Sequence, residues 1–302
     1  MSRDWESVFQ TWAGPSSDTE TTKCENAEKM IRDAIRASDD LAKRDVRVFA
    51  QGSYRNNTNV RQESDVDVCV CNMSVFFSDF STARSFDRDD VGLSDSDYTY
   101  AQFKNEVEAA LVAKFGRAAV TRGNKAFDVH ENTYRVDSDV VAAFEHRRYT
   151  TQSHDGSYHY LSGIEFRPDN GGAIRNWPQQ HYDNGVKKNE ATSRRFKRIV
   201  RILKRLRNEM AEAGMQEAGP IPSFLIECLV WNVPDGGFGH TTLTADVRYA
   251  LAHTFNETLN DEKCHEWGEV SELKYLFRKS QPWTREQAHA FLRAAWNYAG
   301  FE

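Results

Sequence analysis

The chain has 302 residues, a formal net charge of -6, and 39% hydrophobic and 28% charged residues. That length suits one large domain or two modest ones. The sequence has no apolar run near the roughly 18 residues of a membrane span and no secretory segment at its start. We therefore expect a cytoplasmic protein that does not associate with membranes. The acidic balance argues against constitutive binding of nucleic acid.

Hydrophobic periodicity, capping motifs and turn residues predict the elements of the first half of the chain. A helix precedes Gly14-Pro15, and a period of two then indicates strands. In chain order we expect a helix over 5–12, a helix from Ser17 to Ser38, strands over 46–51 and 65–71, a surface excursion over 73–97, a helix capped by residues 94–97 and closed by Gly116, and strands over 118–122, 125–129 and 133–144.

The second half becomes helical after Trp177-Pro178. In chain order we expect a hairpin between 164–166 and Ile174, turning at 169–172, then helices over 196–210, 223–233, 243–259 and 284–296. The polar segment 181–185 is a candidate cleft loop. The fold class is therefore α+β: a lobe of mixed sheet and helices over 1–180, joined to an all-helical lobe over 181–302, with a cleft between them.

Charge is unevenly distributed along the chain. Residues 63–97 include nine acidic and two basic side chains, and residues 187–207 include ten basic and one acidic. Facing each other across a cleft, the two regions would suit metal ions on one wall and phosphates on the other. They could equally be two solvated faces of the protein.

Two carboxylates lie two residues apart in the second predicted strand. Asp65 and Asp67 therefore point to the same face, while the intervening valines point into a core. Such a pair repels unless a cation neutralises it, and oxygen ligands suit Mg²⁺. Upstream, Gly52 allows close backbone approach, and Ser53 offers a hydroxyl and an amide to a phosphate. The next residue, Tyr54, could stack on a base or simply pack in the interior.

Gly52-Ser53, followed twelve residues after the serine by Asp65-x-Asp67, resembles the signature of polymerase-β-type nucleotidyltransferases. The stretch Gln51–Val70 is most similar to the cGAS/DncV-like nucleotidyltransferases (CD-NTases) of bacterial CBASS antiphage systems. That resemblance implies a polymerase-β-like lobe in which Gln51, Gly52 and Ser53 contact nucleotide.

The resemblance also implies a third carboxylate on a later strand. Asp139 precedes Val140-Val141-Ala142-Ala143-Phe144, which matches the family pattern except that Ala142 stands where proline is common. Asp137 would point to the same strand face and competes for this role. We favour Asp139, because the apolar run follows it directly.

Two residues of the helical lobe resemble the family's triphosphate ligands. Lys204 falls on a basic stripe of its helix, and Ser223 follows Pro222 at the start of the next helix, where it could cap the helix and meet an anion. The stripe consists of Lys197, Arg201, Lys204 and Asn208.

Together these residues predict an Mg²⁺-dependent nucleotidyltransferase, and the family resemblance implies that it joins NTPs into a cyclic di- or trinucleotide. Two Mg²⁺ ions (or Mn²⁺) would be held by Asp65, Asp67 and Asp139. The resemblance alone implies cyclisation, the antiphage role and a product-sensing effector partner; we expect a monomer. The alternatives are a template-independent enzyme that makes linear products and a non-catalytic nucleotide-sensing scaffold of the same fold.

Overall fold

The computed structural model describes residues 3–301 except 16, 61–64 and 134. The chain forms two compact units. The sheet unit comprises Ser17–Tyr54 and Ser64–Pro178, and the helical unit comprises Met1–Ser16, Arg55–Glu63 and Gln179–Glu302. One division between the units falls between Pro178 and Gln179. Residues 1–16 and 55–63, however, group with the helical unit rather than with the sheet.

The sheet unit contains all the strands described here. Its elements are α2 (Asp18–Arg36), β1 (Val46–Ala50), the short α3 (Gly52–Arg55, whose last residue belongs to the helical unit), β2 (Val66–Asp79), α4 (Tyr100–Phe115), β3 (Val120–Arg122), β4 (Phe127–Val129), β5 (Ser138–Gln152), β6 (Tyr158–Phe166) and β7 (Ile174–Asn176).

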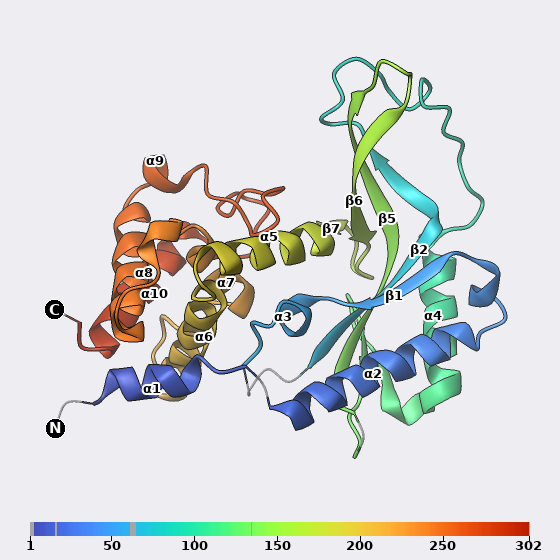
Figure 1. Ribbon diagram of the computed structural model, residues 1–302. Coiled ribbons are helices and arrows are strands. Elements are labelled where there is room, and N and C mark those ends of the chain that lie inside the picture. Colours follow the sequence, from blue (N-terminus) through green and yellow to red (C-terminus); the bar gives the residue numbers. More distant parts are fainter. Residues whose placement is uncertain (1–2, 16, 61–64, 134, 302) are drawn as a thin grey trace. The chain divides into compact units, whose positions relative to one another are not determined.

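The strands of the sheet unit form one mixed sheet. Its order is β1-β2-β5-β4-β3, and β6 pairs with β5 and β7 with β6. The β2–β5 pair is parallel, and the other pairs are antiparallel. Beyond the end of β2, β5 and β6 continue together as a two-stranded ribbon (Figure 1).

The main core of the sheet unit lies between one sheet face and two helices. Alternate residues of β2 and β5 pack there with apolar residues of α2 and α4, because side chains two apart in a strand share a face. A smaller apolar cluster, which includes Cys69 and Val141, covers part of the opposite face. Ser17 caps α2, and Thr99 forms a capping box at α4.

The helical unit contains the remaining helices. They are α1 (Trp5–Trp12), α5 (Pro178–Ala191, whose first residue belongs to the sheet unit), α6 (Phe196–Glu212), α7 (Ser223–Trp231), α8 (Leu243–Glu257), α9 (Asp261–Cys264) and α10 (Arg285–Tyr298). None of the helices in the described part of the chain is long and apolar enough to cross a membrane.

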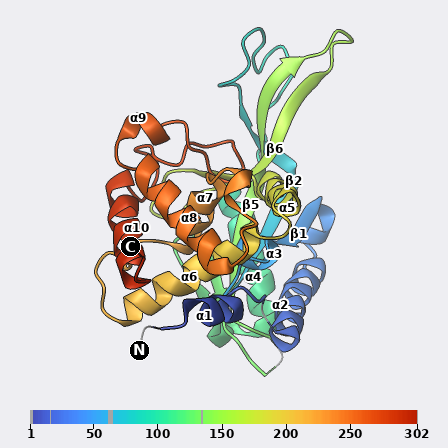
Figure 2. The same ribbon diagram turned by 60° about the vertical axis from the view of Figure 1, so that its left-hand side comes forward.

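Helix α6 is central to the helical unit and contacts α1, α7, α8 and α10 (Figure 2). Helix α1 belongs to this core, because Phe9 is fully buried within it. The carboxylate of Glu6 also accepts hydrogen bonds from the backbone amides of Leu243 and Thr244, at the start of α8. Acceptors at a helix start satisfy otherwise unpaired amides, so α1 stabilises α8 as well as the core.

Three segments differ from their predicted form. The strand expected over 133–144 is β5, which begins at Ser138 and continues to Gln152. The expected surface excursion begins only after Asp79, because β2 continues past a register shift between Asn72 and Phe76. The Asn72 side chain accepts from the amides of Ser74 and Val75 there, and the bulge breaks the alternation that marks a strand. Residues 181–185 are helical within α5 instead of forming a loop.

Candidate active site

Three aspartates form a row across neighbouring strands of the sheet unit. Asp67 of β2 pairs in register with Asp139 of β5, and Asp139 pairs in register with Asp128 of β4. The residues that flank each aspartate in its strand, such as Val66 and Val68, face the core with α2 and α4. Strand alternation therefore puts the three carboxylates together on the other face of the sheet.

The carboxylates of this row disturb one another's ionisation. Burial, a hydrogen bond with Asp128 and the negative charge of Asp67 raise the pKa of Asp139 to about 7. Partial burial and the charges of Asp137 and Asp128 likewise raise the pKa of Asp65, which lies just before β2. A bound cation would reduce the repulsion between these carboxylates.

Gly52 packs directly against Asp67. Its φ of 65° lies in the left-handed region, and a Cβ atom here would stand 2.0 Å from Asp67 Oδ2. The backbone amide of Gln51 donates to the carbonyl oxygen of Asp67 at 2.8 Å. The Gly-Ser segment and the aspartate pair are therefore one local structure, although 61–64 between them lie outside the described residues.

The two residues after Gly52 have different surroundings. Ser53 is half-buried in the short helix α3. Tyr54 packs against the core of the sheet unit, and its hydroxyl donates to the carbonyl oxygen of Thr21 at 3.4 Å. Of the two interpretations of Tyr54, the structure thus favours packing.

Asp137 lies outside strand β5, which begins at Ser138. Its Oδ1 atom accepts a hydrogen bond from the backbone amide of Glu131 at 2.5 Å. The expected common strand face of Asp137 and Asp139 is therefore not found. Asp137 closes a turn, whereas Asp139 faces Asp67.

Lys204 is buried in the helical unit, with 1% of its surface exposed. Its ammonium lies 3.5 Å from Glu227 Oε2 and 3.4 Å from Thr58 Oγ1. Thr58 donates to the same carboxylate at 2.8 Å, and His181 Nε2 lies 2.9 Å from its other oxygen. The predicted basic stripe is thus not a solvated face, because Arg201, at 5% exposure, is buried as well.

Ser223 does not cap α7. It is the first residue of the helix, the N-cap is Pro222, and no side chain caps this end. The Ser223 hydroxyl accepts instead from Arg207 Nη2 at 2.6 Å. The guanidinium of Arg207, on α6, therefore lies beside Ser223, the serine that resembles a triphosphate ligand.

The Gly-Ser and Asp-x-Asp signatures are joined by a segment that packs in the helical unit. Within residues 55–63, Thr58 binds Glu227, and the backbone carbonyl of Asn57 accepts from Arg201 Nη1 at 2.6 Å. Helices α6 and α7 thus hold Asn57 and Thr58 in the helical unit.

Comparison with known proteins decides the family. The model of the cGAS/DncV-like nucleotidyltransferase C-terminal helical domain matches residues 183–300. The chain is 48% identical to the cyclic dipyrimidine nucleotide synthase CdnE of Legionella pneumophila, over 99% of both chains. The chain belongs to the cGAS/DncV-like nucleotidyltransferase family.

Further members of the family agree in sequence and in fold. A cyclic dipyrimidine nucleotide synthase CdnE of Cecembia lonarensis is 42% identical over 100% of both chains. The solved structure of the Rhodothermus marinus CdnE c-UMP-AMP synthase with Apcpp and Upnpp matches with a TM-score of 0.84 and 30% identity. That match covers 98% of this chain and 96% of the other. The predicted α+β fold with a C-terminal helical domain is confirmed.

As a member of this family, the protein is a nucleotidyltransferase that joins NTPs into a cyclic oligonucleotide. The family is associated with CBASS antiphage defence. The predicted family and activity are therefore confirmed. The linear-product and scaffold alternatives are not supported.

Enzymes of this family generally depend on a divalent metal. Among the described residues, no three His, Cys, Asp or Glu side chains already converge as a preformed metal site. The oxygen donors of Asp67 and Asp139, their in-register pairing and the raised pKa of Asp139 nevertheless fit a hard cation such as Mg²⁺. The structure also adds Asp128 to these carboxylates, which the sequence analysis missed.

Proposed function

We propose that this CD-NTase condenses pyrimidine NTPs into a cyclic dipyrimidine dinucleotide. The observation that carries this proposal is the identity, 48% and 42% over essentially the whole chain, to two synthases named for dipyrimidine products. Base choice depends on a few side chains around the nucleotides, and these are most readily shared between relatives that match from end to end.

We assign the metal-binding role to Asp65, Asp67 and Asp139. When bound there, Mg²⁺ would lower the pKa of the acceptor hydroxyl and neutralise the donor triphosphate. Asp67 and Asp139 face each other across two parallel strands, so the sheet holds their separation without loop ordering. Asp128 would act through its hydrogen bond to Asp139, keeping that carboxylate in position.

We assign phosphate contacts to Gln51, Gly52, Ser53, Lys204 and Ser223. The absent Cβ of Gly52 lets the backbone lie against Asp67, and Ser53, which follows directly in the chain, would offer its hydroxyl and amide to a phosphate. Lys204 must give up its present contacts before it can bind a phosphate. Its contacts to Glu227 and Thr58 are long, and its buried ammonium can bind a phosphate oxygen only after they rearrange.

The decisive test is identification of the product. Purified protein with Mg²⁺ and all four NTPs, followed by phosphatase digestion and mass spectrometry, should yield a phosphatase-resistant dinucleotide that contains only pyrimidines. Asp67→Asn should give none. A phosphatase-resistant product that contains purine would contradict the base assignment, and a ladder of phosphatase-sensitive oligomers would contradict cyclisation.

We also propose that the synthase is a monomer whose product is bound by a separate effector protein. The support is the family's place in a signalling system that requires a receptor for its product. Light scattering of the purified chain should give a mass near 34.6 kDa. A mass of twice that value would contradict the monomer.

A further inference from the structure

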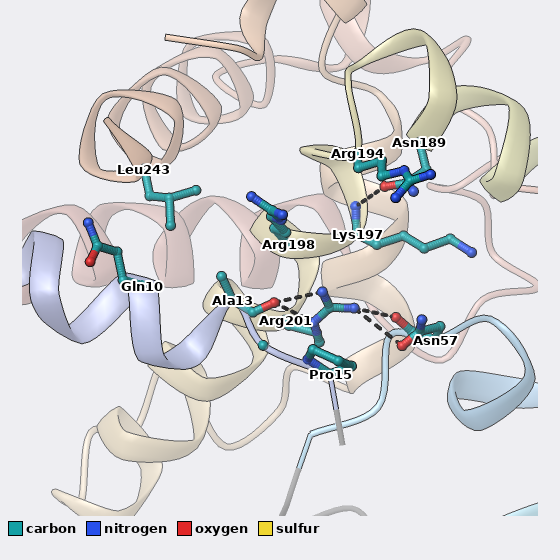
Figure 3. A pocket seen from close by; sticks show the side chains of 11 residues that line it. Gln10, Ala13, Pro15, Asn57, Asn189, Arg194, Lys197, Arg198, Arg201 and Leu243 are labelled. Atoms are coloured by element: carbon teal, nitrogen blue, oxygen red, sulfur yellow. Dashed lines mark hydrogen bonds between the residues drawn. The ribbon is translucent and has the colours of Figure 1, made fainter. Parts of the chain in front are cut away.

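A cationic cavity of about 420 Å³ lies within the helical unit. It is bordered by the end of α1, the link between α5 and α6, and the first turns of α6 (Figure 3). Four of its lining side chains are positively charged, and none of the described residues that line it is acidic: the four are Arg194, Lys197, Arg198 and Arg201.

Of the four cations, Lys197 is stabilised by the charge of Glu227, whereas Arg201 has no acidic partner among the residues that the structure describes. The guanidinium of Arg201 donates to the carbonyl oxygens of Ala13 and Asn57, which are neutral acceptors (Figure 3). Burial and the nearby charges of Arg198 and Arg205 lower the pKa of Arg201 to about 10. Buried cations ordinarily have an anionic partner, so the expected counter-ion of Arg201 is missing from the described residues.

The helix beside the cavity adds to the positive potential. The first turn of α6 contains no acidic residue, although the partial positive charge of a helix N-terminus favours acidic side chains there. Lys197 and Arg198 occupy that turn instead. The amide of Lys197 is bound by the Asn189 side chain at 3.1 Å, within the same cavity (Figure 3). Such a sequence is unfavourable for the isolated helix and favourable for an anion beside it.

We propose that this cavity binds a small molecule that carries a polyphosphate, at a site separate from that of the NTP substrates. Guanidinium groups bind phosphate oxygens in pairs, and two exposed arginines, Arg194 and Arg198, are available for this. The volume falls in the range of small-ligand sites, and Pro15 and Leu243 offer an apolar wall. Lys204 and Ser223 are not among the lining residues.

The test uses inorganic tripolyphosphate as the probe, with the full chain in metal-free buffer. Without metal, the repelling carboxylates of the sheet unit do not favour phosphate binding, and the difference between the parent and a cavity variant in calorimetry reports on the cavity, since such a variant leaves Lys204 and Ser223 unchanged. The parent should bind one tripolyphosphate per chain. Arg194→Gln with Arg198→Gln should weaken that binding at least about tenfold, because charged hydrogen bonds are lost. Arg198→Lys should weaken binding less than Arg198→Gln, because the charge is kept while the paired hydrogen bonds are lost.

The matched control is Lys279→Gln with Arg293→Gln, which removes the same charge from exposed positions outside the cavity. It should bind tripolyphosphate as the parent does. Equal weakening in both double variants would show a general charge effect and overturn the proposal. A raised KM for NTPs in the Arg194→Gln, Arg198→Gln variant would place the cavity in the substrate site and also overturn it. So would a single-stranded oligonucleotide that binds through these arginines when tripolyphosphate does not.

Discussion

At the scale of single residues, Gly52 and Asp67 impose the tightest geometric constraint in the site. The glycine supplies both a left-handed backbone and the space that the carboxylate occupies. In the proposed metal-binding role, Asp67 must be placed within a fraction of an ångström, since small displacements of catalytic groups are costly. Gly52 therefore determines where a neighbouring side chain stands, in addition to allowing a turn.

Gly52→Ala is expected to lower the rate of cyclic-product formation by about a hundredfold or more, because the new Cβ displaces the Asp67 carboxylate. The control is Gly300→Ala, at a φ of 67° with no atom within 4 Å of the added Cβ. It shares the backbone cost, about 1–2 kcal/mol, and should keep its activity. Initial rates and thermal melts of both variants provide the measurement. Full activity in Gly52→Ala would refute the constraint.

Asp139 and Asp137 should respond differently to conversion to asparagine. We expect Asp139→Asn to lose essentially all activity, because Asp139 faces Asp67 across β2 and β5. Asp137→Asn should retain a measurable part, since an amide oxygen can still accept from the Glu131 amide. Product formation with Mg²⁺ decides between them. The opposite ranking would transfer the metal-binding role to Asp137.

At the scale of elements, Glu227 of α7 links three parts of the helical unit: α6, α5 and the segment that contains Thr58. Its carboxylate contacts Lys204, His181 and Thr58, one from each of these parts. Burial opposes its ionisation, but the charges of Lys204 and His181 and the hydrogen bonds to it lower its pKa to about 2. A charge held this way stabilises the fold only while it is ionised.

Glu227→Gln should destabilise the protein by about 3–5 kcal/mol at pH 7, because it leaves Lys204 buried without its counter-ion. The folded-state pKa lies below the unfolded one, so the stabilisation is present above about pH 4.3 and is lost as the pH falls toward 2. Urea unfolding should thus show the largest difference from the parent at neutral pH. Glu262→Gln, at an exposed position, is the control. A difference that does not shrink with acid would contradict the ion pair.

The sequence predicts features that depend on neighbouring residues better than features that depend on strand register or on contacts between distant residues. Alternation suffices to place Asp67 opposite its flanking valines, and Thr284 and Gln287 form the capping box that their spacing indicates. Asp128 joins the carboxylates only through the β4–β5 register, which no local pattern encodes. The burial of Lys204 likewise depends on Glu227, 23 residues away in the chain. Long-range partners decide both positions.

At the scale of the whole molecule, neither unit is a continuous stretch of chain. The helical unit uses α1 and residues 55–63 as well as everything after Pro178. Phe9 is fully buried in its core, and Ala13 accepts from Arg201. The segment from Gln179 onward is consequently an incomplete unit, although it contains most of the helices.

A fragment of residues 179–302 should therefore fail to fold cooperatively, because it exposes the core surface that Phe9 covers and leaves Glu227 without Thr58. The full chain is the reference. Circular dichroism melts and the dispersion of amide signals in NMR provide the measurement. A sharp melting transition in the fragment, close to that of the parent, would show that the two outlying segments are dispensable.

The chain crosses between its two units four times. This constrains which segments can be exchanged between members of the family. A hybrid enzyme made by a single crossover near residue 180 would combine α6 and α8 of one parent with α1 and the 55–63 segment of the other. Contacts such as Thr58 with Glu227 would then be assembled from unmatched sequences. Transferring an intact helical unit from one relative to another therefore requires transplanting three separate stretches at once. Gene shuffling with one junction should yield mostly inactive chimaeras.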